Sequence, residues 1–271
     1  MIGSLLGRRL AAAGAVCRRD MRMYLSYRSR VVSQAISVLV SLTMFYYVSR
    51  LISVSKFGEP QKYFSFVVVG LVVIGVMHAA LGIAVSLRSE LLAGTFERFV
   101  SSPFGAVDGI AAMVLFPVLL EVVFSTLTLA LGAVVFGVPV QWSTAPLALL
   151  VGLGGALIFA AIGLLFAAAV LVFKQASGVV GFVTTAIGLF GGVYFPVSVL
   201  PSWGEWIAKV QPLTAAVALM RHYLIDYPLD GTVEDAVLRM AVFLVVLIPL
   251  AFAGLTGAVR FSRRRATVLE Y

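Results

Sequence analysis

Six long apolar segments follow one another along the chain, and short polar stretches separate them. A helix of about 20 apolar residues is long enough to cross the hydrocarbon core of a bilayer. The pattern therefore predicts an all-α membrane protein with six transmembrane helices. The expected spans are residues 31–49, 63–87 and 106–136, then a segment that follows a turn at 137–146 and ends near residue 173, then 176–194 and 237–259.

The N-terminal residues carry a different pattern, that of an amphipathic helix. Over residues 5–28 the arginines gather on one helical face, and the opposite face is apolar. A basic amphipathic helix of this kind lies in the plane of the membrane interface rather than across the bilayer. We therefore divide the chain into a cytoplasmic interface helix at 1–30 and a six-helix transmembrane domain at 31–271; a solvated tail is the alternative for the first part. The basic face holds Arg8, Arg18, Arg19 and Arg22.

Residues 88–105 hold a charged island between the second and third expected spans. At about 100° per residue, Glu90, Gly94 and Glu97 fall on one face of a helix, and apolar side chains fall on the other face. Gly94 can interrupt the helical run, and Thr95 is a candidate cap for the start of a second helix. The segment is thus expected to form a short amphipathic elbow that offers two carboxylates to whatever lies below the membrane.

Residues 195–231 fit neither an ordinary loop nor a span. The segment is too apolar for a loop, and its prolines break it too often for one helix to cross the bilayer. Broken backbone at membrane depth needs burial against protein or a watery cavity. We therefore expect re-entrant helices that dip into the outer leaflet before the last span. The prolines are Pro196, Pro201, Pro212 and Pro228.

The composition is that of an integral membrane protein. Hydrophobic residues make up 61% of the chain and charged residues 12%, with a mean hydropathy of +1.07, whereas soluble domains carry about 25% charged residues. The single cysteine, Cys17, excludes a disulfide framework and a cysteine-based metal site. The formal charge of +8 indicates membrane orientation more than a nucleic-acid partner, because the arginines cluster at membrane edges.

The Lys and Arg residues assign an orientation to the spans. Fourteen of them lie on the side of the two termini and the elbow, and six lie on the other side. Cytoplasmic loops are enriched in Lys and Arg, so both termini and the elbow are expected to be cytoplasmic. The chain is accordingly predicted to be a multi-pass protein of the cell membrane, in contact with membrane lipids.

The sequence shows no recognisable catalytic machinery. It has no GxxxxGK[ST] phosphate-binding loop and no GxSxG nucleophile elbow. His78 and His222 lie in different regions without companion metal ligands. We therefore predict no catalytic residue, no metal site and no cofactor held by this chain. His78, within the second span, is interpreted as a hydrogen-bonded interior residue, with a proton relay as the alternative.

Glu121 is the most informative single residue, because it lies near the middle of the third expected span. An acidic side chain there costs about 3 kcal/mol on insertion scales and usually faces a bundle interior or a watery pathway. One interpretation is that Glu121 lines a transport route and favours cationic or hydrogen-bonding cargo. The other is a protonated carboxyl that bonds to a neighbouring helix, or to Ser125 one turn further on.

Two motifs resemble those of a known family. After the second span stands Glu90-xxx-Gly94-Thr95-x-Glu97-xxxx-Ser102-Pro103, which is similar to the cytoplasmic signature of type 2 ATP-binding-cassette exporter permeases, above all of the drug and lipid branch. Before the last span stands Gly191-Gly192-Val-Tyr-Phe195-Pro196-Val-Ser-Val-Leu-Pro201-x-Trp203, then Gln211-Pro212-Leu213-Thr214 and Arg221. This stretch resembles the family's Gly-x-x-Phe-Pro…Leu-Pro…Asn-Pro-Leu-Thr…Arg pattern. Together with the length, the span count and the amphipathic N-terminal helix, the resemblance covers nearly the whole chain.

The chain departs from the family pattern at two places. Leu91, Leu92 and Ala93 stand where the family often has charges, which bears on how electrostatic the elbow's contact is. Gln211 stands where the family usually has Asn, a mild change at the start of a helix.

The resemblance implies the permease subunit of an exporter. Two permease subunits, identical or not, would associate around an outward route for an amphipathic drug, lipid or related compound. A separate cytoplasmic ATPase would bind ATP-Mg and supply the energy. In the family the elbow contacts that ATPase, and the outer segment forms an extracellular gate. The implied ATPase contacts are Glu90, Gly94, Thr95, Glu97 and Arg98, and the implied gate residues are Phe195, Pro196, Pro201 and Pro212.

Two other functions compete with this interpretation. A proton-coupled secondary transporter would use Glu121 and His78, but such folds often show inverted repeats, and the sequence shows no convincing repeat. A membrane-embedded enzyme acting on lipid would use Glu121 or His222 as acid or base, but the sequence offers no matching nucleophile or metal set.

Overall fold

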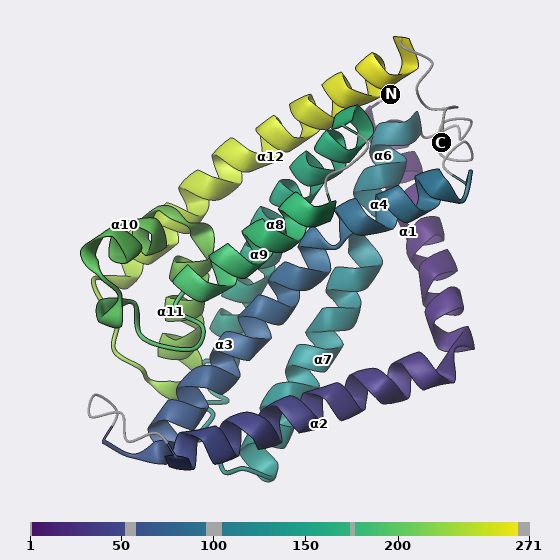
Figure 1. The fold of residues 1–271 in the computed structure, drawn as a ribbon. Helices are drawn as coiled ribbons and strands as arrows, with labels where there is room; N and C mark the ends of the chain where they lie inside the picture. The colour runs from purple at the N-terminus through teal and green to yellow at the C-terminus, as the bar shows by residue number, and fades with distance from the viewer. Residues whose placement is uncertain (1, 52–57, 96–104, 174–176, 265–271) are drawn as a thin grey trace.

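The computed structural model describes residues 2–51, 58–95, 105–173 and 177–264, and the regular structure in these ranges is helical (Figure 1). This confirms the predicted all-α class for the described part of the chain. The first half contains α1 (Ile2–Ser26), α2 (Arg28–Leu51), α3 (Pro60–Leu81), α4 (Ile83–Leu92), α6 (Gly105–Ala112) and α7 (Leu115–Val134). The second half contains α8 (Ala145–Phe173), α9 (Ser177–Phe190), the 3-10 helix η1 (Val197–Val199), α10 (Ser202–Val210), α11 (Pro212–Ile225) and α12 (Val233–Arg264).

Five helical segments of the described chain are long and apolar enough to cross a membrane. The fifth expected span corresponds to α9, which has 14 residues. At 1.5 Å per residue α9 is about 21 Å long, shorter than the roughly 30 Å hydrocarbon core of a bilayer. The six-span layout therefore stays a prediction. The five long segments are Arg28–Leu51, Pro60–Leu92, Gly105–Val134, Ala145–Phe173 and Val233–Ser262, at the places of the other five expected spans.

The helix α8 is the centre of the bundle. It packs along α3, α4, α11 and α12, and the axes of α3, α8, α9 and α12 run in similar directions (Figure 1). Close packing depends on small side chains: the Cα of Gly163 in α8 lies so near the carbonyl of Ala80 in α3 that a Cβ would not fit. We call the end of the bundle where α4 ends and α6 begins the elbow end, and the opposite end, near α11 and residues 135–144, the far end.

The core is built as two main clusters of buried apolar side chains. One lies at the elbow end and joins α4, α6, α8 and α12, with Ile110 and Leu255 among its fully buried members. The other lies beyond it and joins α3, α8 and α11, with Phe159 and Leu219 among its members. Because α8 contributes to both clusters, it connects the elbow end to the outer segment.

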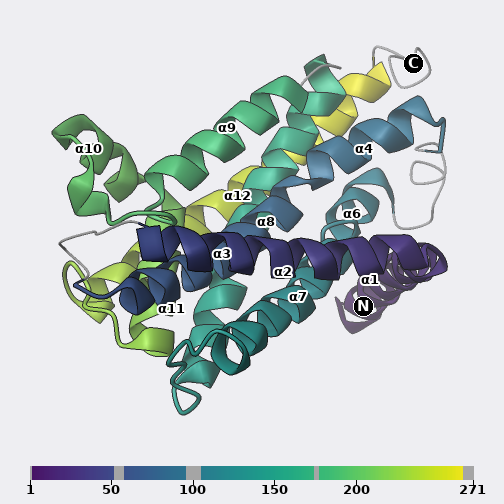
Figure 2. The ribbon, with the colours of Figure 1, turned by 60° about the horizontal axis from the view of Figure 1, so that its bottom comes forward.

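The helices α1 and α2 lie on the outside of this core. The helix α1 packs on α6 and α7 and crosses the direction of α3 at a steep angle, as Figures 1 and 2 show. Tyr27 separates α1 from α2, which runs back toward the far end and touches α3 and α7. Most side chains of α2 are exposed, and Leu42 is its one fully buried large apolar side chain. The expected domain boundary at residue 30 thus falls in the first turn of α2.

Candidate functional site

The end of α4 has a backbone geometry that glycine adopts most easily. Gly94 has φ +66°, in the left-handed region that a residue without Cβ reaches at little cost. The N–H of Thr95 donates to the carbonyl of Glu90, and the N–H of Gly94 donates to the carbonyl of Leu91, both at 3.1 Å. These two bonds form a Schellman motif, in which a glycine closes the carboxyl end of a helix. Gly94 therefore stops α4 at this point.

Thr95 turns back toward α4. Its hydroxyl donates to the carbonyl oxygen of Glu90 at 3.2 Å and also contacts the Glu90 carboxylate. The predicted role of Thr95 as the cap of a second helix concerns residues 96–104, which lie outside the described residues. Glu97 and Arg98, two of the predicted ATPase contacts, lie outside them as well.

Glu90 also joins the elbow to the N-terminal helix. One guanidinium nitrogen of Arg19 lies 3.3 Å from a carboxylate oxygen of Glu90 and 2.8 Å from a carboxylate oxygen of Asp20. The side chains of Arg19 and Glu90 are 39% and 20% exposed, so water screens their attraction only in part. The ion pair connects α1 to the last turn of α4.

Asp20 makes this junction sensitive to protonation. Burial raises the pKa of the Asp20 carboxyl above its ordinary value; the Arg19 guanidinium acts against this effect, and the Glu90 carboxylate adds to it. The junction therefore holds two carboxylates around one guanidinium, in a partly buried place where an unprotonated Asp20 is disfavoured.

Prolines start the short helices of the outer segment. Pro196 precedes η1, Pro201 precedes α10, and Pro212 is the first residue of α11. Proline suits these positions because its φ is fixed near −65° and the first turn of a helix does not need its N–H. Pro196 and Pro212 are buried, Phe195 is half-buried, and Pro201 is exposed. The predicted gate residues thus lie on one compact segment beside the far half of the bundle.

Arg221 attaches this outer segment to the bundle. Its side chain is buried, and the guanidinium donates to the carbonyl oxygens of Phe66, Gly192 and Val193 at 3.0, 2.7 and 2.8 Å. The guanidinium also lies over the ring of Phe66. The side chain belongs to α11, and its partners belong to α3 and to the chain just after α9, so a single residue holds three segments together. A polar cavity of about 270 Å³ adjoins it, lined in part by Lys209, Asp230, Asp235 and Arg239.

Glu121 lies between α7, α3 and α1. Its carboxyl is so close to Gly75 of α3 that a Cβ there would collide with it. Tyr24 of α1 lies near enough for an electrostatic interaction with Glu121. The predicted hydrogen bond between Glu121 and Ser125 is wrong: the Ser125 hydroxyl is buried without a hydrogen-bond partner in the described part of the chain. The reason is that Glu121 is directed at Gly75, whereas Ser125 lines a cleft.

His78 lies on the exposed side of α3. The predicted interior placement of His78 is therefore wrong for the chain by itself. The helix α3 packs against α7, α8 and α11, and the face that carries His78 is left outside. Among the described residues, no hydrogen bond or ion pair joins His78 to Glu121.

The family model of the ABC-2 type transporter matches residues 12–225. This region runs from α1 to the end of α11 and includes both the elbow and the outer segment. The chain belongs to the ABC-2 type transporter family. No curated protein matches the chain.

As an ABC-2 type transporter, the chain is a multi-pass membrane permease and a non-catalytic component of an ATP-binding-cassette transporter. Permeases of this family work with cytoplasmic ATPase subunits. The family match thus agrees with the resemblance that the two sequence motifs indicated.

Sequence reasoning missed three residues of this ABC-2 transporter's site. Arg19 was grouped with the other arginines of the basic face, and nothing in the sequence separates it from Arg18 or Arg22. Asp20 is the only acidic residue in the first 58 positions, which was a usable signal. No sequence pattern indicated that Gly75 makes room for the side chain of Glu121.

Proposed function

We propose that the chain is the permease subunit of an exporter, and that two such subunits form an outward route for an amphipathic drug, lipid or related compound. A separate cytoplasmic ATPase binds ATP-Mg and drives the movement. In this proposal the protein spans the cell membrane six times, with α9 and the residues after it as the fifth crossing, and both termini are cytoplasmic. The partner permease is either a second copy or a related chain.

The ion pair between Arg19 and Glu90 is the observation that carries the mechanism. It supports an arrangement in which α1 and the elbow move together when an ATPase pushes on either of them. The ATPase contacts in this proposal are Glu90, Gly94, Thr95 and, outside the described residues, Glu97 and Arg98. ATP can shift the permease toward one arrangement only if the ATP-bound ATPase binds that arrangement more tightly.

At the far end, the outer segment acts as the gate in this proposal. Phe195, Pro196, Pro201 and Pro212 belong to it, and Arg221 connects it to α3 and to the end of α9. A movement of α3 relative to α9 would strain the bonds of Arg221. That coupling supports a gate that opens when the helices of the bundle rearrange.

Glu121 is proposed to line the route and to favour cationic or hydrogen-bonding cargo. The carboxyl packs against Gly75 and makes no hydrogen bond to Ser125 in the described part of the chain, which supports this role. The test is Glu121→Gln in a transport assay with a cationic and a neutral compound. Equal transport of both by the wild type and the variant would contradict the role.

The decisive experiment compares two charge reversals in vesicles that contain the permease with its partner ATPase. Glu97→Arg should lower transport per ATP hydrolysed at least tenfold while the protein stays folded. Glu59→Arg, the same change in an exposed pair with Lys62 at the opposite end, should keep wild-type coupling. Wild-type coupling in the Glu97→Arg variant would show that the elbow is not the contact.

The same vesicles separate the exporter from a proton-coupled transporter. Transport that requires ATP and persists without a proton gradient supports the exporter. Transport driven by a proton gradient without ATP, and lost in Glu121→Gln, would overturn it. The exposed position of His78, and the lack of a hydrogen bond or ion pair between His78 and Glu121, give the proton pathway no support among the described residues.

A further inference from the structure

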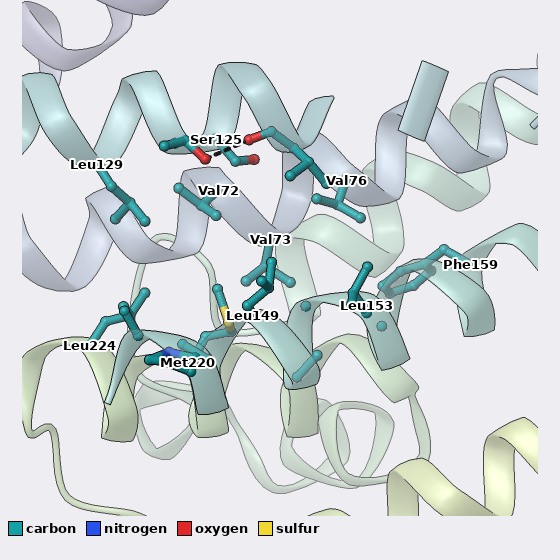
Figure 3. Close-up of a pocket in the computed structure, with 18 of the residues that line it drawn as sticks. Val72, Val73, Val76, Ser125, Leu129, Leu149, Leu153, Phe159, Met220 and Leu224 are labelled. Atoms are coloured by element: carbon teal, nitrogen blue, oxygen red, sulfur yellow. Dashed lines mark hydrogen bonds between the residues drawn. The ribbon is translucent and has the colours of Figure 1, made fainter. Parts of the chain in front are cut away.

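A cleft of about 430 Å³ lies within this single subunit, between α7 and α8. Both helices pack along α3 but make little contact with each other, so they form the two walls of the cleft. The floor is formed by Val72, Val73 and Val76 of α3, and Met220 and Leu224 of α11 close one end, as Figure 3 shows. The cleft is separate from both the elbow and the outer cavity beside Arg221.

The cleft is long, and its opening lies along the side of the helix bundle. Ala145 and Phe159 both line it, and their separation along α8 corresponds to about 21 Å at 1.5 Å per residue. Trp142, Leu149 and Leu153 stand at its rim and are 59%, 52% and 44% exposed. The helices α7 and α8 belong to segments apolar enough to cross a membrane, so Leu149 and Leu153 at the rim lie on a segment suited to hydrocarbon.

Ser125 gives the cleft its one buried side-chain polar atom without a hydrogen-bond partner in the described part of the chain. The side chain is 8% exposed and lines the cleft, and its hydroxyl has no hydrogen-bond partner among these residues. The neighbouring hydroxyls behave differently: Thr126 donates to the carbonyl of Val122 at 2.8 Å, and Thr128 to that of Phe124 at 2.7 Å. A buried hydroxyl without a partner is unfavourable. The Ser125 oxygen itself has almost no exposed surface, so its side chain rotates toward the cleft to pair with a ligand, which gains from this bond.

We propose that this cleft binds one slender apolar molecule that carries a single hydrogen-bonding group, such as a long-chain alcohol, and that the molecule enters from the bilayer. The hydrocarbon chain lies between α7 and α8 along α3, and its oxygen pairs with the hydroxyl of Ser125. Three observations fit this chemistry: an elongated shape, walls that are almost entirely apolar, and one unpaired hydroxyl. The volume falls within the roughly 300–1,000 Å³ typical of small-molecule sites.

The site is complete within one subunit. Binding therefore requires neither the ATPase nor the second permease, and it is distinct from the route proposed between two subunits. A failure of transport would leave this proposal intact, and a failure of binding would leave the exporter proposal intact.

The first test uses the full-length chain in lipid nanodiscs and a dodecanol that carries a photoreactive diazirine at mid-chain. Labelled peptides mapped by mass spectrometry should come from the cleft-lining parts of α3, α7 and α8. Unlabelled dodecanol should compete about fivefold better than dodecane, because it adds one hydrogen bond. Labelling spread evenly over all exposed helices would overturn the proposal.

Two pairs of variants sharpen the test. Ser125→Ala should remove the preference for dodecanol over dodecane, whereas Thr126→Val should retain it, because the Thr126 hydroxyl is already bonded to Val122. Gly152→Leu should reduce labelling at least tenfold, because Gly152 lines the cleft and its position has room for a side chain. Gly181→Leu, which adds the same side chain in open space on α9, should label as the wild type does.

A monodisperse elution profile of each variant shows that it is folded. A preference for dodecanol that survives in Ser125→Ala would overturn the hydrogen bond, and full labelling of a folded Gly152→Leu variant would overturn the site.

Discussion

A guanidinium nitrogen of Arg19 lies 3.3 Å from the carboxylate of Glu90, although 71 positions separate the two residues. Arg19 belongs to α1, and Glu90 belongs to the last turn of α4. An ion pair with this exposure adds at most about 1 kcal/mol to stability. Its larger effect is geometric, because it is a direct side-chain connection between α1 and the elbow.

The first prediction concerns this pair. Arg19→Ala should leave the melting temperature within about 3 °C of the wild type, because the pair is worth at most about 1 kcal/mol. It should nevertheless lower the stimulation of ATP hydrolysis by cargo severalfold, because α1 no longer follows the elbow. The measurement is ATP hydrolysis by the permease–ATPase complex with and without cargo.

Exchange of the two charges is the control. The double variant Arg19→Glu with Glu90→Arg should recover part of the stimulation, and Lys62→Ala, which breaks an exposed pair at the other end, should change nothing. Equal loss in the Arg19 and Lys62 variants would argue against a specific link.

The second prediction concerns pH. The pKa of Asp20 is raised in the folded protein, mainly by burial, so folding favours its protonated form. The resulting stability is fully present below the unfolded pKa of about 3.9 and is lost as pH rises through the folded value. Asp20→Asn cannot lose a proton. Its melting temperature should therefore exceed that of the wild type near pH 7, and the difference should shrink toward pH 4.

Thermal unfolding in detergent at several pH values and one salt concentration measures this difference. Glu59→Gln, which removes an exposed carboxylate at the other end of the bundle, is the matched control. A difference between Asp20→Asn and the wild type that grows toward low pH would contradict the assigned direction.

The third prediction concerns the contact between α3 and α7. Gly75→Val should destabilise the protein by about 1 to 3 kcal/mol, because the new side chain meets the carboxyl of Glu121. The second substitution Glu121→Ala should recover most of the loss by removing that carboxyl. Gly181→Val, at a helical glycine with open space around it, should lose less than half as much. Thermal unfolding of the four proteins decides whether the two sites are coupled.

The fourth prediction concerns Arg221. Arg221→Met should cost about 3 kcal/mol or more, because three buried carbonyl oxygens lose their donor at once. Arg221→Lys should recover only part of this, because an ammonium lacks the planar fork of a guanidinium. Lys209→Met, at a side chain that is 65% exposed, should be close to neutral. An Arg221→Met variant as stable as the Lys209 variant would mean that the outer segment is held by other contacts.

The apolar pattern predicted the long helices because burial in a membrane depends on length and composition. The helices α2 and α8 lie where the first and fourth spans were expected, and α12 extends beyond the expected sixth span at both ends. The fifth span was misjudged in length. Its apolar run continues to Tyr194, but Gly192 adopts φ +72° and the helix has already ended at Phe190.

In helices that are apolar on every face, the sequence could not predict which side chains point outward. In α3 almost every residue is apolar, so periodicity could not show which side faces outward, and His78 was placed inside. A similar limit applies to Ser125: Glu121, Thr126 and Thr128 lie near it in α7, and the sequence could not show which of these polar side chains lines a cleft. The junction of Arg19 with Glu90 depends on how α1 packs on α6 and α7, which no local pattern encodes.

The loose attachment of α2 bears on how the protein is made. A membrane protein is inserted from its N-terminus, so α2 enters the bilayer before the helices that form the core exist. Its side chains have no protein partners at that moment, and most of them are still exposed in the folded chain. The first helix to arrive therefore keeps nearly the same surroundings throughout biogenesis, and the later helices can assemble beside it without displacing it.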